Sequence, residues 1–298
     1  DAAQSVADAL AWRDAVASAT AAGPYVNIVV NAGELFGAAI QSALQPDMSV
    51  ATPERVMVEF LSPNTNKPLH LGHVRNGVLG SAMANILTAV GHTVIRANLV
   101  NDRGIHICKS MLAYKRWGNG ETPQTTGDKG DHLVGRWYVR FEEEMRRQKA
   151  QAGLAEDAKT EIHHEVEEML RQWEKGDENV LSLWKRMNGW VYDGFAETYA
   201  RYGFHFDTFY YESQLYLLGK DIALEGLDRG IFTRREDGSV AYYLPIKKYG
   251  TDPGERQRTE TLLRNDGTAL YTTQDLGVAV KKAMEHNLDR SIYVVACE

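Results

Sequence analysis

The chain has little cysteine and no long apolar run. Cys108 and Cys297 are its only two thiols in 298 residues, far apart in the sequence. Such sparse cysteine excludes the disulfide framework of a small secreted domain and is typical of a reducing compartment. No run of about twenty apolar residues is present, and the alanine-rich N-terminal stretch lacks a secretory signal's basic segment and cleavage site. We therefore expect a soluble, cytoplasmic protein with no membrane partner.

An excess of positive charge is also missing. The formal net charge is −7 at pH 7, which argues against a dedicated nucleic-acid coat, because binding to phosphates is driven by clustered Lys and Arg. An enzyme with one local basic track remains compatible with this charge. The length leaves ample room for a buried core and predicts about two domains.

Residues 1–50 predict a small N-terminal module. The alanine-rich residues 1–19 predict a helix, the β-branched run between Pro24 and Gly33 predicts a strand, and a second helix follows. The order then changes to strand (56–62), polar loop, helix from Leu71 and strand (93–100). This βαβ order predicts a parallel sheet, with a ligand site where the first strand ends.

The middle of the chain, residues 105–205, predicts long helices whose dense charges are solvated faces. Its aromatic side chains could stack on RNA, but core packing is the better interpretation, so they are assigned no site: Trp137, Tyr138, Trp173, Trp184 and Trp190. Short β-rich pieces are predicted at 207–213, 231–245 and 260–277, and an apolar strand at 291–298.

The most informative motif is His-Leu-Gly-His, at His70 to His73, where the polar loop meets the predicted helix. A helix N-terminus offers unpaired N–H groups and a positive dipole end, which suit a triphosphate. Gly72 leaves room for a flat base against the backbone. Two histidines three apart are otherwise common as surface or capping residues, and without a helical Glu or a cysteine cluster they are poor candidates for a zinc site.

The segment SPNTNKPLHLGH, residues 62–73, resembles the first signature of class I aminoacyl-tRNA synthetases in its arginyl form. Segments 101–114, 207–213 and 262–277 also resemble arginyl-tRNA synthetases, in the expected order. The resemblance implies an α/β fold: a Rossmann-like (HUP-type) parallel-sheet catalytic domain with a helical and β insertion, preceded by part of a small α/β N-terminal domain. It implies an arginine–tRNA ligase that uses ATP.

On that resemblance, an ATP site is implied at Ser62, Lys67, His70, Gly72 and His73. Lys67, His70 and His73 would be catalytic, because they neutralise charge as the arginine carboxylate attacks the α-phosphate. Taken alone, Lys67 would be an exposed loop lysine. Mg²⁺ is expected with ATP rather than at a dedicated protein site, and no protein-bound metal is predicted.

The substrate L-arginine requires acids, since its guanidinium is a planar fork of five donors that is never deprotonated. The resemblance nominates six residues for arginine: Glu59, Ser62, Asn64, Glu212, Tyr271 and Asp275. Glu212 and Asp275 would face the guanidinium, whereas Asn64 and Glu59 would lie nearer the amino-acid head. Without the motifs, Asp275 could be a helix N-cap and Glu212 a surface acid.

The resemblance also implies domain boundaries. Residues 1–50 would be the C-terminal part of a tRNA-contacting module, and 51–298 an incomplete catalytic domain. Within that domain, 51–118 would be the first βαβ half, 119–260 a connective insertion and 261–298 the return to the nucleotide fold. The Lys-Met-Ser-Lys-Ser-type loop and the anticodon-binding domain are absent from these residues. We therefore expect a fragment that neither activates arginine nor charges tRNA(Arg) by itself, from an enzyme that is a monomer.

Two other hypotheses stay open. The chain could be a binding or scaffold module descended from a synthetase, or another nucleotidyltransferase or synthetase with the same His-x-Gly-His turn. Lys67, His70, His73 and the two pocket acids favour the ligase over the scaffold. The Ser-Pro-Asn prefix and the YTTQD segment argue against a different substrate.

Overall fold

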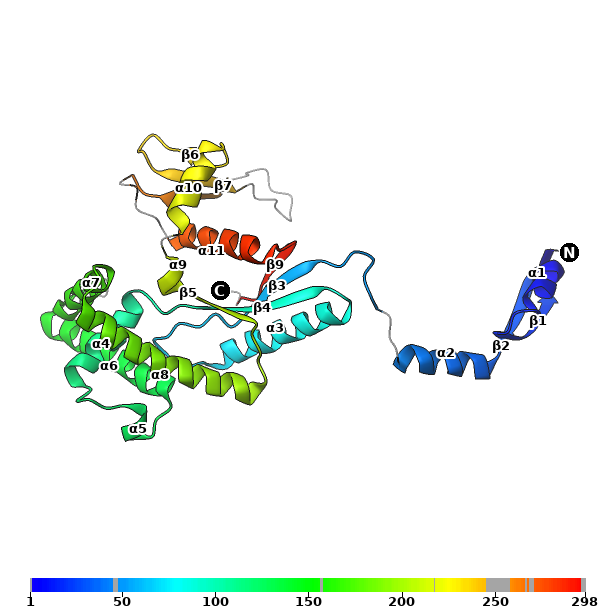
Figure 1. The fold of residues 1–298 in the computed structure, drawn as a ribbon, viewed down its shortest axis with the longest axis horizontal. Coiled ribbons are helices and arrows are strands. Elements are labelled where there is room, and N and C mark those ends of the chain that lie inside the picture. Colours follow the sequence, from blue (N-terminus) through cyan, green and yellow to red (C-terminus); the bar gives the residue numbers. More distant parts are fainter. Residues whose placement is uncertain are drawn as a thin grey trace. The chain divides into compact units, whose positions relative to one another are not determined.

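The computed structural model describes residues 2–44, 48–155, 158–216, 218–244, 258–265, 267 and 271–295, and only the backbone of 244, 258, 271 and 272. The chain divides into two compact units (Figure 1). Residues 1–53 and 89–91 form the first unit, and residues 54–88 and 92–298 form the second. None of the helices in the described part of the chain is long and apolar enough to cross a membrane.

The first unit is an α-β-β-α module. It contains α1 (Ala2–Leu10), β1 (Val16–Ala22), β2 (Tyr25–Val30) and α2 (Ala32–Leu44). The strand predicted between Pro24 and Gly33 is confirmed, but the helix predicted over 1–19 is wrong beyond Leu10. Val16–Ala22 instead pairs antiparallel with β2 across a turn in which Gly23 has a φ of 61°. Hydrogen bonding between the strands therefore outweighs the helix propensity of alanine here.

A four-stranded parallel sheet organises the second unit, with the order β5-β4-β3-β9. Its strands are β3 (Arg55–Glu59), β4 (Thr93–Val100), β5 (Thr208–Tyr211) and β9 (Arg290–Tyr293). The apolar residues Val56 to Val58 are all buried, as expected for a strand covered on both faces. The predicted βαβ unit and the Rossmann-like parallel-sheet class are confirmed.

Helix α3 (Leu71–Ala89) is the crossover between β3 and β4. Its fit against the sheet depends on small residues, because a Cβ at Gly80 would overlap the ring of Phe60 and a Cβ at Gly77 would lie 2.5 Å from the Phe204 ring. The two glycines therefore allow the helix to lie close against Phe60 and Phe204. The histidine motif is consequently held at the carboxyl end of β3.

The predicted long helices form a helical insertion between β4 and β5 (Figure 1, green), namely α4 (Ile105–Trp117), α5 (Pro123–Thr126), α6 (Gly130–Ala152), α7 (Glu161–Glu174) and α8 (Glu178–Tyr202). In α7 the buried side chains recur at helical spacing: Ile162, Val166, Met169 and Trp173. Trp137 and Trp173 are buried in the same core, as expected.

Cys108 is a buried free thiol whose pKa is raised to about 12 by burial, whereas Cys297 lies outside the described residues.

Between β5 and β9 lie α9 (Glu212–Leu215), α10 (Gly219–Asp228), α11 (Tyr271–His286) and an antiparallel sheet. The sheet contains β6 (Thr233–Arg234), β7 (Val240–Leu244) and β8 (Arg258–Leu263). The β-rich prediction for 260–277 is wrong from Tyr271 onward, where α11 begins. Helical packing decides this segment: Leu276 and Val278 enter two different apolar clusters, and Gly277 packs closely on Gly219.

Candidate functional site

The loop between β3 and α3 turns sharply at the carboxyl end of the sheet. Leu61 and Ser62 have positive φ angles of 72° and 42°, which redirect the chain out of the strand. The loop after β4 is tied to it, since the N–H of Thr65 donates to the carbonyl of Asn101 (3.0 Å) and the Asn101 N–H donates to the Pro63 carbonyl (2.9 Å). The two loops therefore form one rim at the sheet edge where α/β proteins bind ligands.

The two histidines of the motif pack on each other at the start of α3. Their ring centroids are 4.0 Å apart, the His70 N–H donates to Nδ1 of His73 (3.2 Å), and the Gly72 N–H donates to Nδ1 of His70 (3.1 Å). Burial, with the nearby charges of His70 and Lys67, lowers the pKa of His73 to about 4. A neutral His73 and the exposed Lys67 thus lie together at a helix N-terminus, an arrangement suited to phosphate oxygens.

Three of the residues nominated for arginine line one cavity of about 220 Å³: Asn64, Glu212 and Asp275. They come from the rim loop, from the start of α9 and from the first turns of α11. Partial burial raises the pKa of the Glu212 carboxyl, and Asp102 and Asp275 add to the rise while Arg103 opposes it. Partial burial also raises the pKa of Asp275, together with the charge of Glu59. We call this cavity, with its two mutually repelling acids, the acidic pocket.

Glu59 and Ser62 lie side by side, because Ser62 Oγ donates to Glu59 Oε1 at 3.3 Å. Glu59 is 7% exposed and forms a buried ion pair with Lys282 of α11. Glu59 and Asp275 both line a neighbouring cavity of about 520 Å³. The carboxyl group nominated for the amino-acid head therefore already has a cation from this chain beside it.

The structure does not bring every nominated residue into the acidic pocket. Lys67, His70 and His73 do not line it, although Asn64 of the same loop does. The side chain of Tyr271 lies outside the described residues, and only its helical backbone at the start of α11 is described. The described residues include no group of three or more His, Cys, Asp or Glu side chains placed to hold a metal ion.

Asp102 was assigned no role from the sequence, yet it organises the acidic pocket. It is 1% exposed, and its carboxylate accepts from the Ser213 N–H (2.8 Å), from Ser213 Oγ (2.7 Å) and from the Tyr192 hydroxyl of α8 (2.7 Å). Ser213 directly follows Glu212. The position of Asp102 just after the apolar strand 93–100, at the same edge as Ser62, was the sequence signal that could have identified it.

Asn101 and Arg103, on either side of Asp102, also contribute to this edge. Asn101 lines the acidic pocket. The Arg103 guanidinium lies 3.9 Å from the ring centroid of Tyr216, another pocket residue, and it pairs with Glu174 of α7. A fixed cation beside Glu212 partly offsets the repulsion between the two pocket acids. Part of the pocket's negative charge is therefore already compensated.

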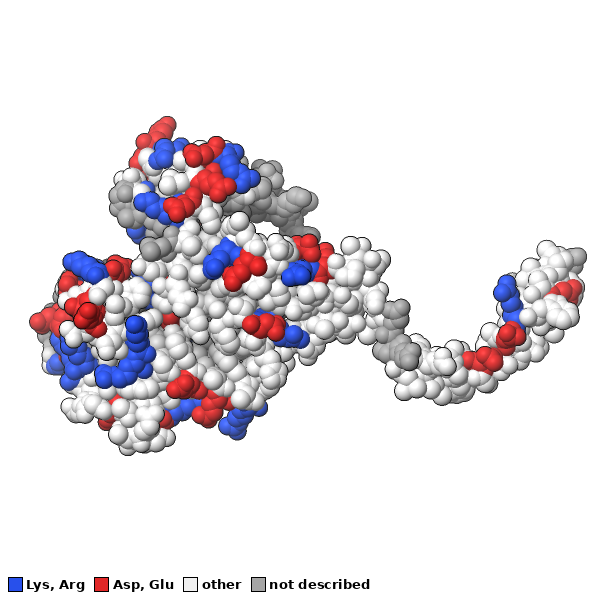
Figure 2. Space-filling model, in the orientation of Figure 1, with Lys and Arg blue, Asp and Glu red and all other residues white. Residues whose placement is uncertain are grey.

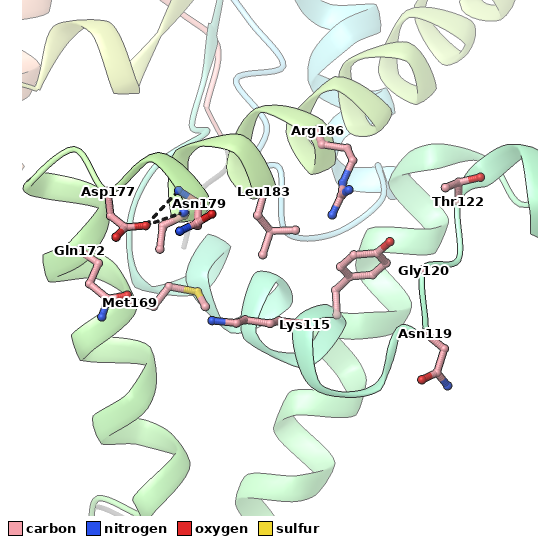
Figure 3. Close-up of a pocket in the computed structure, with 12 residues that line it drawn as sticks. Lys115, Asn119, Gly120, Thr122, Met169, Gln172, Asp177, Asn179, Leu183 and Arg186 are labelled. Carbon is pink, nitrogen blue, oxygen red and sulfur yellow. Dashed lines mark hydrogen bonds between the residues drawn. The ribbon is translucent and has the colours of Figure 1, made fainter.

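A second hollow, of about 530 Å³, lies within the helical insertion between α4, α7 and α8 (Figure 3). Its charged side chains include Lys115 and Arg186. None of the residues nominated from the sequence lines it. Two cations at its rim make it unsuitable for a guanidinium, so it is not the candidate arginine site.

Comparison with known proteins agrees with this geometry. Residues 38–298 match the profile of the family described as "tRNA synthetases class I (R), catalytic domain". The arginine–tRNA ligase of Bacteroides thetaiotaomicron is 50% identical over 253 residues, covering 83% of this chain and 41% of the relative. That of Phocaeicola vulgatus is 48% identical over 275 residues, covering 87% of this chain and 44% of the relative.

Solved structures give the same answer. The arginyl-tRNA synthetase of Thermus thermophilus superposes with a TM-score of 0.65 at 27% identity, over 94% of this chain and 44% of that one. That of Plasmodium falciparum, at 14% identity, supports the fold alone, with a TM-score of 0.62 over 94% of this chain and 46% of that one. The chain thus spans less than half the length of these relatives. With its sequence motifs, parallel sheet and profile match in agreement, the chain belongs to the arginyl-tRNA synthetase family of class I tRNA synthetases.

Proposed function

We propose that this chain carries the ATP and arginine sites of an arginine–tRNA ligase, which activates L-arginine with ATP and transfers it to the 3′ end of tRNA(Arg). The observation that carries the proposal is the convergence of Glu212 and Asp275, distant in sequence, in one cavity with Asn64. That cavity adjoins the loop that leads to the paired histidines. We further propose a monomeric, cytoplasmic enzyme.

Arginine suits the acidic pocket for reasons of charge and shape. A guanidinium presents five N–H donors in a plane and remains protonated, so two carboxylates can each accept from it. Burial and neighbouring acids raise the pKa values of Glu212 and Asp275, and a cation that enters the pocket favours their ionised forms and so opposes both effects. Lysine carries one compact ammonium and would leave part of this acceptor surface unpaired.

The amino-acid head of arginine would then lie toward Asn64, Ser62 and Glu59. Ser62 and Glu59 are already hydrogen-bonded to each other at 3.3 Å, and the Glu59 carboxylate is paired with Lys282. Tyr271, at the first position of α11, is proposed to line the guanidinium side. This orientation directs the substrate carboxylate toward the histidine end of the rim loop.

ATP is proposed to bind at the start of α3, with Ser62, Lys67, His70, Gly72 and His73 around its base and phosphates. The helix N-terminus and Lys67 would stabilise negative charge as the arginine carboxylate attacks the α-phosphate in line and pyrophosphate leaves. Since the pKa of His73 is lowered to about 4, its imidazole is neutral at pH 7 and can donate a hydrogen bond to a phosphate oxygen without charge. Mg²⁺ would arrive with ATP and supply charge neutralisation at its phosphates.

The proposed domain roles follow: residues 1–50 contact tRNA, and 51–298 hold the small substrates, with the insertion at 119–260. The test of substrate identity is thermal stabilisation of the full-length protein by arginine, lysine, glutamine or cysteine, each with ATP and tRNA. Stabilisation specific to arginine supports the proposal, and equal shifts for lysine and arginine would refute it.

A further inference from the structure

The hollow within the helical insertion has an apolar floor. Met169 of α7 and Val180 of α8 are buried at its base, with Leu183 one turn further along α8. The buried ring of Tyr114, from the last turns of α4, completes this surface. A cavity of about 530 Å³ with an apolar floor and polar edges has the dimensions of a small-molecule or nucleotide site.

Two cations of this hollow lack an acidic partner among the described residues: Lys115 of α4 and Arg186 of α8. Several other arginines of the insertion are paired with acids, as in Arg116–Glu165, Arg136–Glu121 and Arg171–Glu168. The chain as a whole carries a net charge of −7, so acids are not scarce. Figure 2 shows Lys and Arg interspersed with Asp and Glu over the helical insertion, whereas the surface over the sheet in that view is largely uncharged.

The guanidinium of Arg186 is oriented by aromatic rings. It lies 5.7 Å from the centroid of Tyr114 and 5.8 Å from that of Trp190. Ring contacts hold the flat face of a guanidinium and leave its N–H groups free to donate in the plane. In Figure 3 Arg186 extends from α8 into the hollow, and the Lys115 side chain extends along its floor toward Met169.

One carboxylate, Asp177, also borders the hollow, but it is engaged elsewhere. Its Oδ1 accepts from the N–H groups of Asn179 and Val180, both at 3.0 Å, as the N-cap of α8. The positive end of the helix dipole therefore offsets its charge. Gln172 and Asn179 contribute side-chain amides, and Thr122 contributes a hydroxyl. These groups can donate hydrogen bonds to, or accept them from, the polar edge of a base.

We propose that this hollow binds one nucleotide of an RNA strand. A phosphate would bind between Lys115 and Arg186, the sugar and base would lie over the apolar floor, and the amides would contact the base edge. The inference rests on the proposed function in one respect: the RNA is taken to be the tRNA substrate. The site is separate from the acidic pocket, and none of its lining residues is shared with that pocket.

The test is the salt dependence of tRNA binding, measured by fluorescence anisotropy with the full-length protein. The double variant Lys115→Ala with Arg186→Ala removes the proposed phosphate contacts. The matched control, Lys175→Ala with Lys185→Ala, removes the same charge from exposed positions near the hollow that do not line it. We expect the first variant to weaken binding on the order of tenfold and to reduce the slope of log K against log salt by about 1.

The control variant should change affinity by less than about threefold. Equal weakening by both variants would overturn the proposal, because it would show only the loss of general positive charge. No weakening by either variant would overturn it as well. Retained stabilisation by arginine shows that the first variant is folded and that the acidic pocket is intact.

Lysine acylation, read by mass spectrometry, distinguishes the source of the nucleotide. Bound tRNA should reduce the acylation of Lys115 at least about fivefold more than that of Lys175 or Lys185. A parallel measurement uses AMP as the probe for a free nucleotide. Protection by tRNA supports the proposal, whereas protection by AMP alone would overturn the assignment to an RNA strand. Glu212→Gln separates the two proposals: it should abolish arginine binding while leaving the protection of Lys115 unchanged.

Discussion

The acidic pocket and the hollow of the helical insertion show how charge selects between two cavities of one chain. The acidic pocket, at about 220 Å³, is less than half the volume of the hollow at about 530 Å³. Its two acids lie at the start of α9 and in the first turns of α11, where partial burial raises their pKa values, whereas the cations of the hollow are exposed side chains on α4 and α8. Chemistry and position, rather than size, therefore identify the candidate arginine site.

The comparison is tested most severely by neutralising the pocket acids. Asp275→Asn and Glu212→Gln should each reduce arginine-dependent ATP–pyrophosphate exchange by about a hundredfold or more, because each removes a charge-assisted acceptor from a partly buried cation. The assay uses the full-length protein with tRNA present. Lys175→Ala is the control and should retain exchange, because this exposed residue lines neither cavity. If both acid variants kept wild-type exchange, the acidic pocket would not be the arginine site.

A smaller effect is expected at Asp102, which contacts no substrate in the proposal. Asp102→Asn replaces one acceptor of a buried network by a donor, so it should misplace Ser213 and Glu212. We expect the KM for arginine to rise on the order of tenfold, with kcat for exchange changed less than about threefold. Tyr192→Phe removes a single hydrogen bond and should have a weaker effect of the same kind. A fall in kcat with an unchanged KM would contradict a positioning role.

The effect of pH on arginine binding is expected to be smaller than the effects of these substitutions. Because the pKa values of Glu212 and Asp275 are raised, these acids take up protons at a higher pH than ordinary carboxyl groups. Arginine stays charged throughout, so its affinity should fall as the pH decreases, by a few-fold for each pH unit below the raised pKa. Calorimetric titration of the full-length protein with arginine measures this. An affinity that rose on acidification would show that the acids are not the acceptors.

The smallest expected effect is on arginine binding in the hollow variant. Lys115→Ala with Arg186→Ala should change the KM for arginine by less than about twofold, since both residues lie outside the acidic pocket. The same exchange assay at saturating tRNA provides the measurement. A large rise in the KM for arginine would mean that the two cavities are energetically coupled.

Much of the candidate site could be anticipated from local sequence. The apolar run at 56–58, the polar loop and the helix-spaced residues after Leu71 predicted the strand–loop–helix unit that carries His70 and His73. These features depend on neighbours a few positions away, so periodicity captures them. Residues 271–277 were mispredicted for the opposite reason. Their helix is stabilised by packing against Gly219 and two separate apolar clusters, which no local pattern reveals.

Asp102 shows the same limit within the site. Its sequence neighbourhood marks a loop after a strand, but its role depends on Tyr192 and Ser213, which lie far along the chain. Lys282 is a second example, since a lysine in a charged helix predicts a solvated face, yet it is 1% exposed and paired with Glu59. Buried ionic contacts of this kind become visible only when distant strands and helices are placed together.

By itself, the sequence determined the fold class and the family and nominated candidate residues for ATP and arginine, because motifs and short-range periodicity carry this information. The tertiary structure decided which of those residues meet. It placed Asn64, Glu212 and Asp275 around one cavity, tied that cavity to α8 through Asp102, and left Lys115 and Arg186 without an acid among the described residues. The physical reason is that electrostatic interactions act over a few ångströms in space, and only folding sets those distances.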